Sequence, residues 1–183
     1  ENRDYYAALA QVESLPQRAA SVALLRAGIL RQLDPVESER WYRALLGTCL
    51  SGHAEHGLGL LEASRGRYAD ALVRLRVAAR AYPSDPRIRN DLGVIHLYLR
   101  DDSRAAFELR TAHELAKDDP QPRFNLMLLA LLQADSSGWM SLRERWQPDG
   151  ATRAELRAAC QRVMPVRLGS GTSLAGCPVD PMI

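Results

Sequence analysis

Long apolar runs, a strong net charge and lysine are absent or scarce in this sequence. No apolar run approaches the roughly 18 residues that a membrane-spanning helix needs. The formal net charge is only +2, and no basic run is interleaved with aromatic residues, so we expect no nucleic-acid partner. Lysine is nearly absent, since of 24 basic residues only Lys117 is a lysine. Because the arginines are scattered along the chain, this bias indicates a GC-rich genome rather than a phosphate-binding surface.

Cysteine is also scarce. The three cysteines, Cys49, Cys160 and Cys177, leave at least one unpaired and do not have a metal-binding spacing. Cys49 lies in the apolar stretch 44–50, which predicts a small residue buried in the core. Cys160 and Cys177 could pair and tether the C-terminal residues, but only in an oxidising compartment.

The apolar residues recur at helical spacing. Hydrophobic residues make up 46% of the chain and charged residues 25%, which is typical of folded domains rather than disordered segments. Sustained period-two alternation is missing, so we expect an all-α protein. Near the N-terminus we expect helices over 3–14, 17–33 and about 35–49, the third of them entered through an Asp34-Pro35 cap.

A motif then recurs with a period of 34 residues, from Asp85-Pro86 to Asp119-Pro120. The unit that begins at Gly52 alternates bulky and small residues at fixed positions, namely Leu58, Gly59, Ala71, Leu75, Ala78 and Pro83. The unit that begins at Pro86 repeats the pattern with Leu92, Gly93, Ala105, Leu109 and Ala112. Small residues let the two helices of a pair cross closely, bulky residues fill the space beside the crossing, and proline ends the second helix.

In these positions the chain resembles the tetratricopeptide repeat family, which implies a solenoid of helical hairpins. We expect N-terminal helices over 1–51 and a core of two full repeats and a half repeat over 52–134. Trp139 occupies a position of the third repeat at which the motif requires a small residue, so we expect the repeat geometry to end there. The segment 135–164 is expected to close the array with two helices, over 139–147 and 151–164.

Both ends of the chain leave alternatives open. Residues 165–183 are expected to form a flexible or extended tail, which is either native or an engineered linker joined to a peptide. The chain begins at Glu1 and not at Met, so we expect that a segment was removed, either a signal peptide or a stretch trimmed deliberately.

The resemblance also implies a binding surface, because the first helix of each repeat lines the concave face of such arrays. The candidate peptide-binding groove comprises His56, Leu60, Arg87, Asn90, Val94, Leu97, Tyr98, Phe124, Leu128 and Leu131. A groove that is polar at one end and apolar along the rest suits an amphipathic or extended peptide. The alternative is that the closing helices or the tail already cover these leucines as part of the core.

Catalytic and metal-binding patterns are weak. His53 and His56 stand at i and i+3, but a zinc site needs a third protein ligand and nothing nearby supplies one. We find neither a phosphate loop nor a nucleophile elbow. We therefore expect a protein that is not an enzyme and that has no metal and no cofactor.

Repeat number, size and arginine-rich composition make the chain similar to the pilotin-type and TadD-like lipoproteins of pilus assembly. That resemblance implies a periplasmic protein at the outer membrane, held there by a lipid anchor ahead of Glu1, that binds the C-terminal segment of a secretin. The alternative is a cytoplasmic chaperone for secreted translocator proteins.

Overall fold

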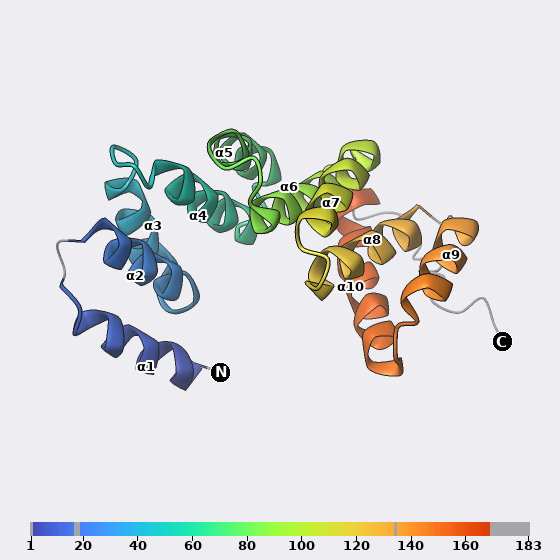
Figure 1. Cartoon of the computed structure of the whole chain (residues 1–183), viewed down its shortest axis with the longest axis horizontal. Coiled ribbons are helices and arrows are strands. Elements are labelled where there is room, and N and C mark those ends of the chain that lie inside the picture. The colour runs from blue at the N-terminus through green and yellow to red at the C-terminus, as the bar shows by residue number, and fades with distance from the viewer. Residues whose placement is uncertain (1, 17–18, 134, 169–183) are drawn as a thin grey trace. The chain divides into compact units, whose positions relative to one another are not determined.

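The computed structural model describes residues 2–16, 19–133 and 135–168, and every regular element within these ranges is an α-helix (Figure 1). The expected all-α class is therefore confirmed. The chain divides into two compact units, residues 1–84 and 85–183. The predicted tail from residue 169 onward, with Cys177, lies outside the described residues.

In the part of the first unit that the structure describes there are five helices: α1 (Asn2–Glu13), α2 (Ala20–Leu33), α3 (Pro35–Ala44), α4 (Ser51–Ser64) and α5 (Tyr68–Ala81). α2 pairs with α3, and α4 pairs with α5. A core between α2, α3 and α4 contains Ala27, Tyr42, Leu45, Ala54, Leu58 and Leu61.

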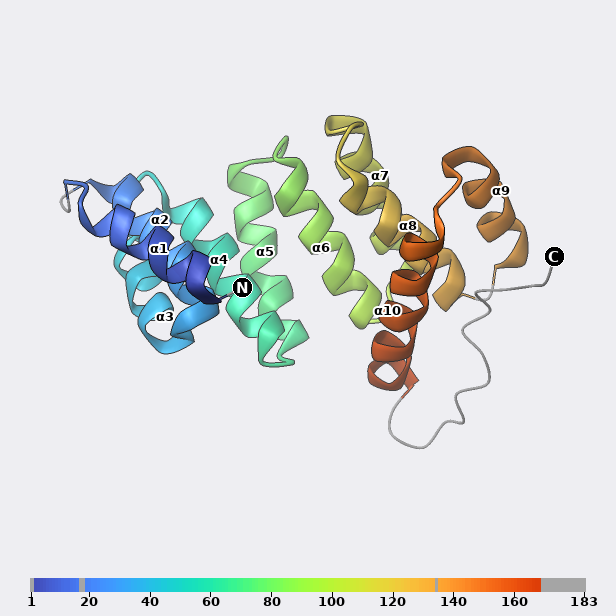
Figure 2. The same cartoon turned by 90° about the horizontal axis from the view of Figure 1, so that it is seen from below.

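The described residues of the second unit, 85–133 and 135–168, also form five helices: α6 (Pro86–Tyr98), α7 (Asp102–Leu115), α8 (Pro120–Leu132), α9 (Ser136–Trp146) and α10 (Gly150–Leu168). α6 pairs with α7, and α8 packs against α7, α9 and α10. Figure 2 shows α10 lying beside α8. The core of this unit combines residues of α6, α7 and α8 with Trp139 of α9 and Leu156, Cys160 and Val163 of α10.

Three Asp-Pro steps begin helices, as the sequence predicts. The side chain of Asp34 accepts hydrogen bonds from the backbone N–H groups of Val36 and Glu37. Asp85 and Asp119 cap α6 and α8 in the same way, and each is followed by proline at the first helical position. A capping carboxylate satisfies N–H groups that have no partner within the helix, and proline has no N–H to satisfy.

The close crossings predicted for each hairpin are confirmed. A Cβ added to Gly59 of α4 would lie 2.9 Å from Cγ of Leu75 in α5. In the next hairpin, a Cβ on Gly93 of α6 would lie 2.6 Å from Cγ of Leu109 in α7. Both leucines are fully buried, so each fills the space that the glycine leaves open.

Two predictions need correction. Cys49 is exposed and not buried, because α3 ends at Ala44 and residues 45–50 form turns, so the apolar stretch is not a continuation of the helix. The last closing helix does not end at residue 164, because α10 continues to Leu168 with Pro165 inside it. The final turn of α10 brings Arg167 against α7, where it is ion-paired with Asp102, and this contact favours the longer helix.

Candidate peptide-binding surfaces

The predicted groove positions on α6 fall into two groups. Arg87 is exposed, and Val94 and Tyr98 are half-buried. Asn90 and Leu97 are buried, Leu97 with only 1% of its surface exposed. Since 87, 94 and 98 are spaced by whole helical turns, the three accessible residues share one face of α6.

The predicted positions on α8 divide in the same way. Phe124 is half-buried and packs against the core of its unit. Leu128 and Leu131 belong to that core, with 5% and 2% of their surfaces exposed, together with residues of α10. Both leucines are therefore buried in the core of this unit, to which α10 contributes, and they are not open to a partner.

The groove positions that remain at least partly accessible in the second unit are Arg87, Val94, Tyr98 and Phe124, which we call the first-helix strip. A buried hydrogen bond lies beside it, in which Nδ2 of Asn125 donates to Oδ1 of Asn90 at 2.8 Å. This bond joins α6 to α8 and holds the two first helices of the unit in register.

Arg87 is the charged end of this strip. Its Nη2 donates to Oδ2 of Asp85 at 3.0 Å and its Nε to Oδ1 at 3.3 Å. Hydrogen bonding to Asp85 raises the pKa of Arg87, so the guanidinium stays charged. Because the Arg87 side chain is 72% exposed, the net strength of the pair is about 1 kcal/mol or less, and Arg87 can exchange Asp85 for a ligand group at little cost.

A pocket of about 450 Å³ adjoins Phe124. It is lined on α8 by Gln121, Arg123, Phe124 and Met127, and on the other side by the connection from α9 to α10. Sequence reasoning missed this pocket because its second wall comes from the closing helices, which do not follow the repeat.

In the first unit, His56 and Leu60 are both half-buried on α4. His53 stacks on Tyr82 with ring centroids 4.0 Å apart. Within residues 2–16, 19–133 and 135–168, no group of three or more His, Cys, Asp or Glu side chains is placed to hold a metal ion.

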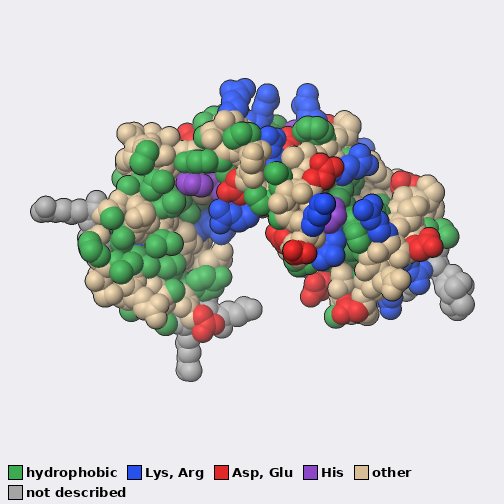
Figure 3. Space-filling view, viewed as in Figure 1, with side chains coloured by type: hydrophobic (Ala, Val, Ile, Leu, Met, Phe, Trp, Pro, Cys, Tyr) green, Lys and Arg blue, Asp and Glu red, His purple; other side chains and the backbone are tan. Residues whose placement is uncertain are grey.

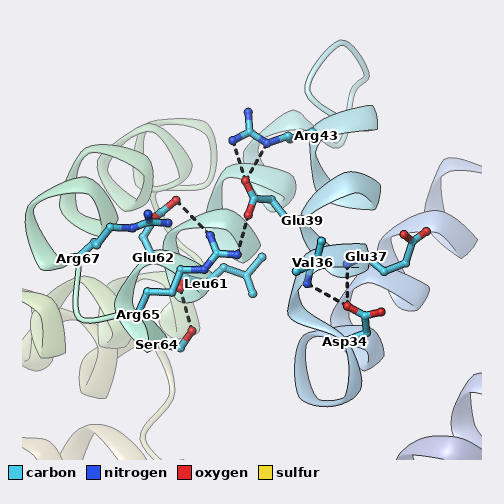
Figure 4. A network of polar contacts seen from close by, with 10 residues as sticks. All are labelled: Asp34, Val36, Glu37, Glu39, Arg43, Leu61, Glu62, Ser64, Arg65 and Arg67. Atoms are coloured by element: carbon cyan, nitrogen blue, oxygen red, sulfur yellow. Dashed lines mark hydrogen bonds and ion pairs between the residues drawn. The ribbon is translucent and has the colours of Figure 1, made fainter.

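The first unit also contains a charged pocket of about 660 Å³ between α3, α4 and α5. Figure 4 shows polar contacts among some of the acidic and basic residues that line it. Arg65 bridges Glu39 of α3 and Glu62 of α4, at 2.7 Å and 3.8 Å. Hydrogen bonds from Arg43, and then from Arg65, lower the pKa of Glu39. Because acidic and basic groups in this pocket neutralise one another, we assign it a structural role in joining the helices.

None of the helices in the described part of the chain is long and apolar enough to cross a membrane.

The chain matches no family model. It is 42% identical over 162 residues to the TPR repeat-containing protein PA4299 of Pseudomonas aeruginosa, a match that covers 87% of this chain and 66% of that protein. The chain thus spans about two thirds of the length of this relative.

Solved structures of low sequence identity share the fold. YrrB, described as a TPR protein with an unusual peptide-binding site, has a TM-score of 0.60 at 19% identity, over 88% of this chain and 87% of that one. A chain of the APC/C hetero-tetramer Cut9–Hcn1 has a TM-score of 0.66 at 19% identity, over 88% of this chain and 34% of that one. A tetratricopeptide repeat protein from Parabacteroides merdae has a TM-score of 0.63 at 15% identity, over 90% of this chain and 66% of that one. The repeat positions, the helical hairpins and the curated relative together show that the chain belongs to the tetratricopeptide repeat (TPR) family.

Proposed function

We propose that the chain is a protein-interaction scaffold that binds a peptide segment of a partner along the first-helix strip. The observation that carries this proposal is that the strip stays accessible although α10 covers the leucines beside it. Apolar side chains of a bound peptide pack against Val94, Tyr98 and Phe124. Arg87 donates to a peptide carbonyl or carboxylate at the polar end.

The structural neighbours support a partner of this kind. One is described by its peptide-binding site, and another is part of a hetero-tetramer of different proteins. They share the helical-hairpin fold with this chain, and they are the basis for expecting a protein or peptide partner here.

More specifically, we assign the scaffold to the assembly of a bacterial pilus or secretion system. In this role it acts like a pilotin at the periplasmic side of the outer membrane and binds the C-terminal segment of a secretin. Membrane association then depends on a lipid anchor ahead of Glu1 and not on the helices described here. This assignment rests on the resemblance in repeat number and composition.

Site-specific photo-crosslinking in the source organism tests the binding surface and identifies the partner. A photoreactive phenylalanine analogue is placed at Tyr98 in the strip or, as a matched control, at Phe107, which is 63% exposed on α7. We expect a covalent adduct from position 98 that mass spectrometry identifies as secretin, and no such adduct from position 107. Equal adducts from both positions would contradict the proposed surface.

Cell fractionation tests the finer assignment separately. A pilotin-like protein is recovered with the outer membrane and loses that location when its lipid-attachment cysteine is replaced. Recovery in the cytoplasm, with a secreted translocator as the cross-linked partner, would instead favour the chaperone role. In that outcome the binding surface stands and the pilus assignment fails.

A further inference from the structure

A second pocket in the second unit lies away from the first-helix strip. It has a volume of about 560 Å³ and is formed by α7, α8 and α9, so we call it the α7–α9 pocket. Its volume falls within the range of about 300–1,000 Å³ that is usual for ligand sites. None of the candidate groove residues lines it. Its walls come from α7, which is the second helix of a repeat, from residues of α8 outside the candidate groove, and from α9.

The floor of the α7–α9 pocket is apolar. It is formed by Leu126, Leu129 and Ala130 of α8 with Leu142 and Trp146 of α9. The three α8 residues are buried, whereas Leu142 and Trp146 are half-buried and pack against the same core. A floor of this kind can accept one or two apolar side chains and removes their surface from water.

The rim of the pocket carries an excess of positive charge. It includes Arg110 of α7, Lys117 in the connection from α7 to α8 and Arg145 of α9, against the carboxylates of Glu114 and Asp135. Asp135 caps α9 by accepting a hydrogen bond from the N–H of Gly138 at 2.9 Å, and this bond lowers the pKa of Asp135. That carboxylate therefore serves the helix and keeps its negative charge, so the rim carries three cations against two carboxylates.

These cations are available to a ligand. Among the described residues, Arg110, Lys117 and Arg145 form no ion pair with a carboxylate. The guanidinium of Arg145 instead lies 5.8 Å from the centre of the Trp146 ring, at the edge of the apolar floor. Figure 3 shows Lys and Arg side chains gathered around a histidine over this part of the unit.

His113 adds a hydrogen-bonding group to the same pocket. Its ring meets Trp146 edge-on with centroids 5.4 Å apart, and its buried Nδ1 has no hydrogen-bond partner among the described residues. Burial lowers the pKa of His113, and the nearby Arg123 and Arg145 lower it further, so the imidazole is neutral at pH 7. A buried polar atom without a partner costs free energy that a ligand hydrogen bond would recover.

We infer that the α7–α9 pocket is a second docking site, which binds a partner segment carrying a carboxylate next to apolar side chains. The apolar side chains enter the floor, and the carboxylate lies among Arg110, Lys117 and Arg145. A bare polyphosphate would leave the apolar floor uncovered and would face Glu114, so the combination of charge and apolar surface favours an acidic, apolar peptide.

Selection from a random dodecapeptide library displayed on phage tests this inference with the full chain. The bait is the Val94→Asp variant, which weakens the first-helix strip and so separates the two sites. We expect selected peptides to carry Asp or Glu beside Leu, Ile or Phe. Binding should weaken about tenfold or more in the double variant Lys117→Glu and Arg145→Glu, and also in Ala106→Phe, which fills the pocket without changing its charge.

A matched control carries the same change of charge elsewhere. Arg76→Glu and Arg80→Glu reverse two exposed arginines of α5 in the first unit, and they should leave binding unchanged. Circular dichroism confirms that each variant stays folded. Selected peptides without acidic residues, or acidic peptides that bind the pocket variants as tightly as the bait, would overturn the inference. Binding to phosphatidylglycerol vesicles that is lost in the pocket variants, without any acidic peptide being selected, would overturn it in favour of a lipid surface.

Discussion

Arg167 in the last turn of α10 and Asp102 in the first turn of α7 form an ion pair in which the arginine is buried and the aspartate is half-buried. Nη2 of Arg167 donates to Oδ2 of Asp102 at 2.9 Å, and Nη1 lies 2.9 Å from Oδ1. The Arg167 side chain is only 6% exposed. The pair joins residues 65 positions apart and fixes the end of the helix that covers Leu128 and Leu131.

Breaking this pair from one side should destabilise the second unit. Asp102→Asn leaves the buried guanidinium of Arg167 without a counter-charge, and we expect a loss of about 3 kcal/mol in the free energy of unfolding. The double variant Asp102→Leu and Arg167→Met removes both charges and should recover most of that loss. Urea denaturation followed by tryptophan fluorescence measures all variants, and strictly additive effects would contradict the pairing.

Enlarging Gly93 should also destabilise the second unit. A Cβ there would lie 2.6 Å from Cγ and 3.3 Å from the backbone nitrogen of Leu109, so α6 and α7 must move apart. We expect Gly93→Ala to cost about 1–2 kcal/mol, despite the better helix propensity of alanine. Gly47→Ala is the matched control because nothing lies within 4 Å of its added Cβ. Equal unfolding midpoints for the two variants would show that the crossing is looser than described.

Glu39 should make the stability of the first unit depend on pH. Its pKa is lowered from 4.5 by the hydrogen bonds from Arg43 and Arg65, so the unfolded chain takes up the proton first as pH falls. The contribution of Glu39 is therefore fully present above about pH 4.5 and is lost as pH falls through the lower, folded-state value.

The matching measurement compares Glu39→Gln with the wild type. At pH 7 the variant should be about 0.5–1 kcal/mol less stable, since the Glu39 side chain is 20% exposed and its ion pairs are partly screened. The difference should shrink toward zero near pH 2. Glu37→Gln is the control because its partner Arg40 is largely exposed. A difference that grows as pH falls would refute the assigned sign.

The repeat fold was predictable from sequence because its determinants are local. Gly93 and Leu109 lie on adjacent helices of one hairpin, and the identity of each limits the distance between those helices. The same holds for the Asp-Pro caps, where one residue accepts the N–H groups of the next few. Cys49 was misplaced because an apolar composition does not show where a helix ends, and α3 ends before it.

The binding surfaces were predictable only in part. Helical periodicity places Leu97, Leu128 and Leu131 on apolar helix faces, but it does not tell whether a partner or another helix covers those faces. In the structure they are buried in a core to which α10 contributes, and the last turn of α10 pairs with a residue 65 positions away, which no local pattern contains. The α7–α9 pocket was missed for a similar reason, because Lys117 and Arg145 are brought together by the packing of α7, α8 and α9.

The affinity of the partner segment for the first-helix strip tests the central claim most directly. Fluorescence anisotropy measures the dissociation constant of a labelled peptide that covers the segment cross-linked at position 98. The account predicts that Val94→Asp weakens this peptide about tenfold or more, whereas Phe107→Asp, at an exposed position outside the strip, leaves it unchanged. An unchanged affinity in a folded Val94→Asp variant would contradict peptide binding at this surface.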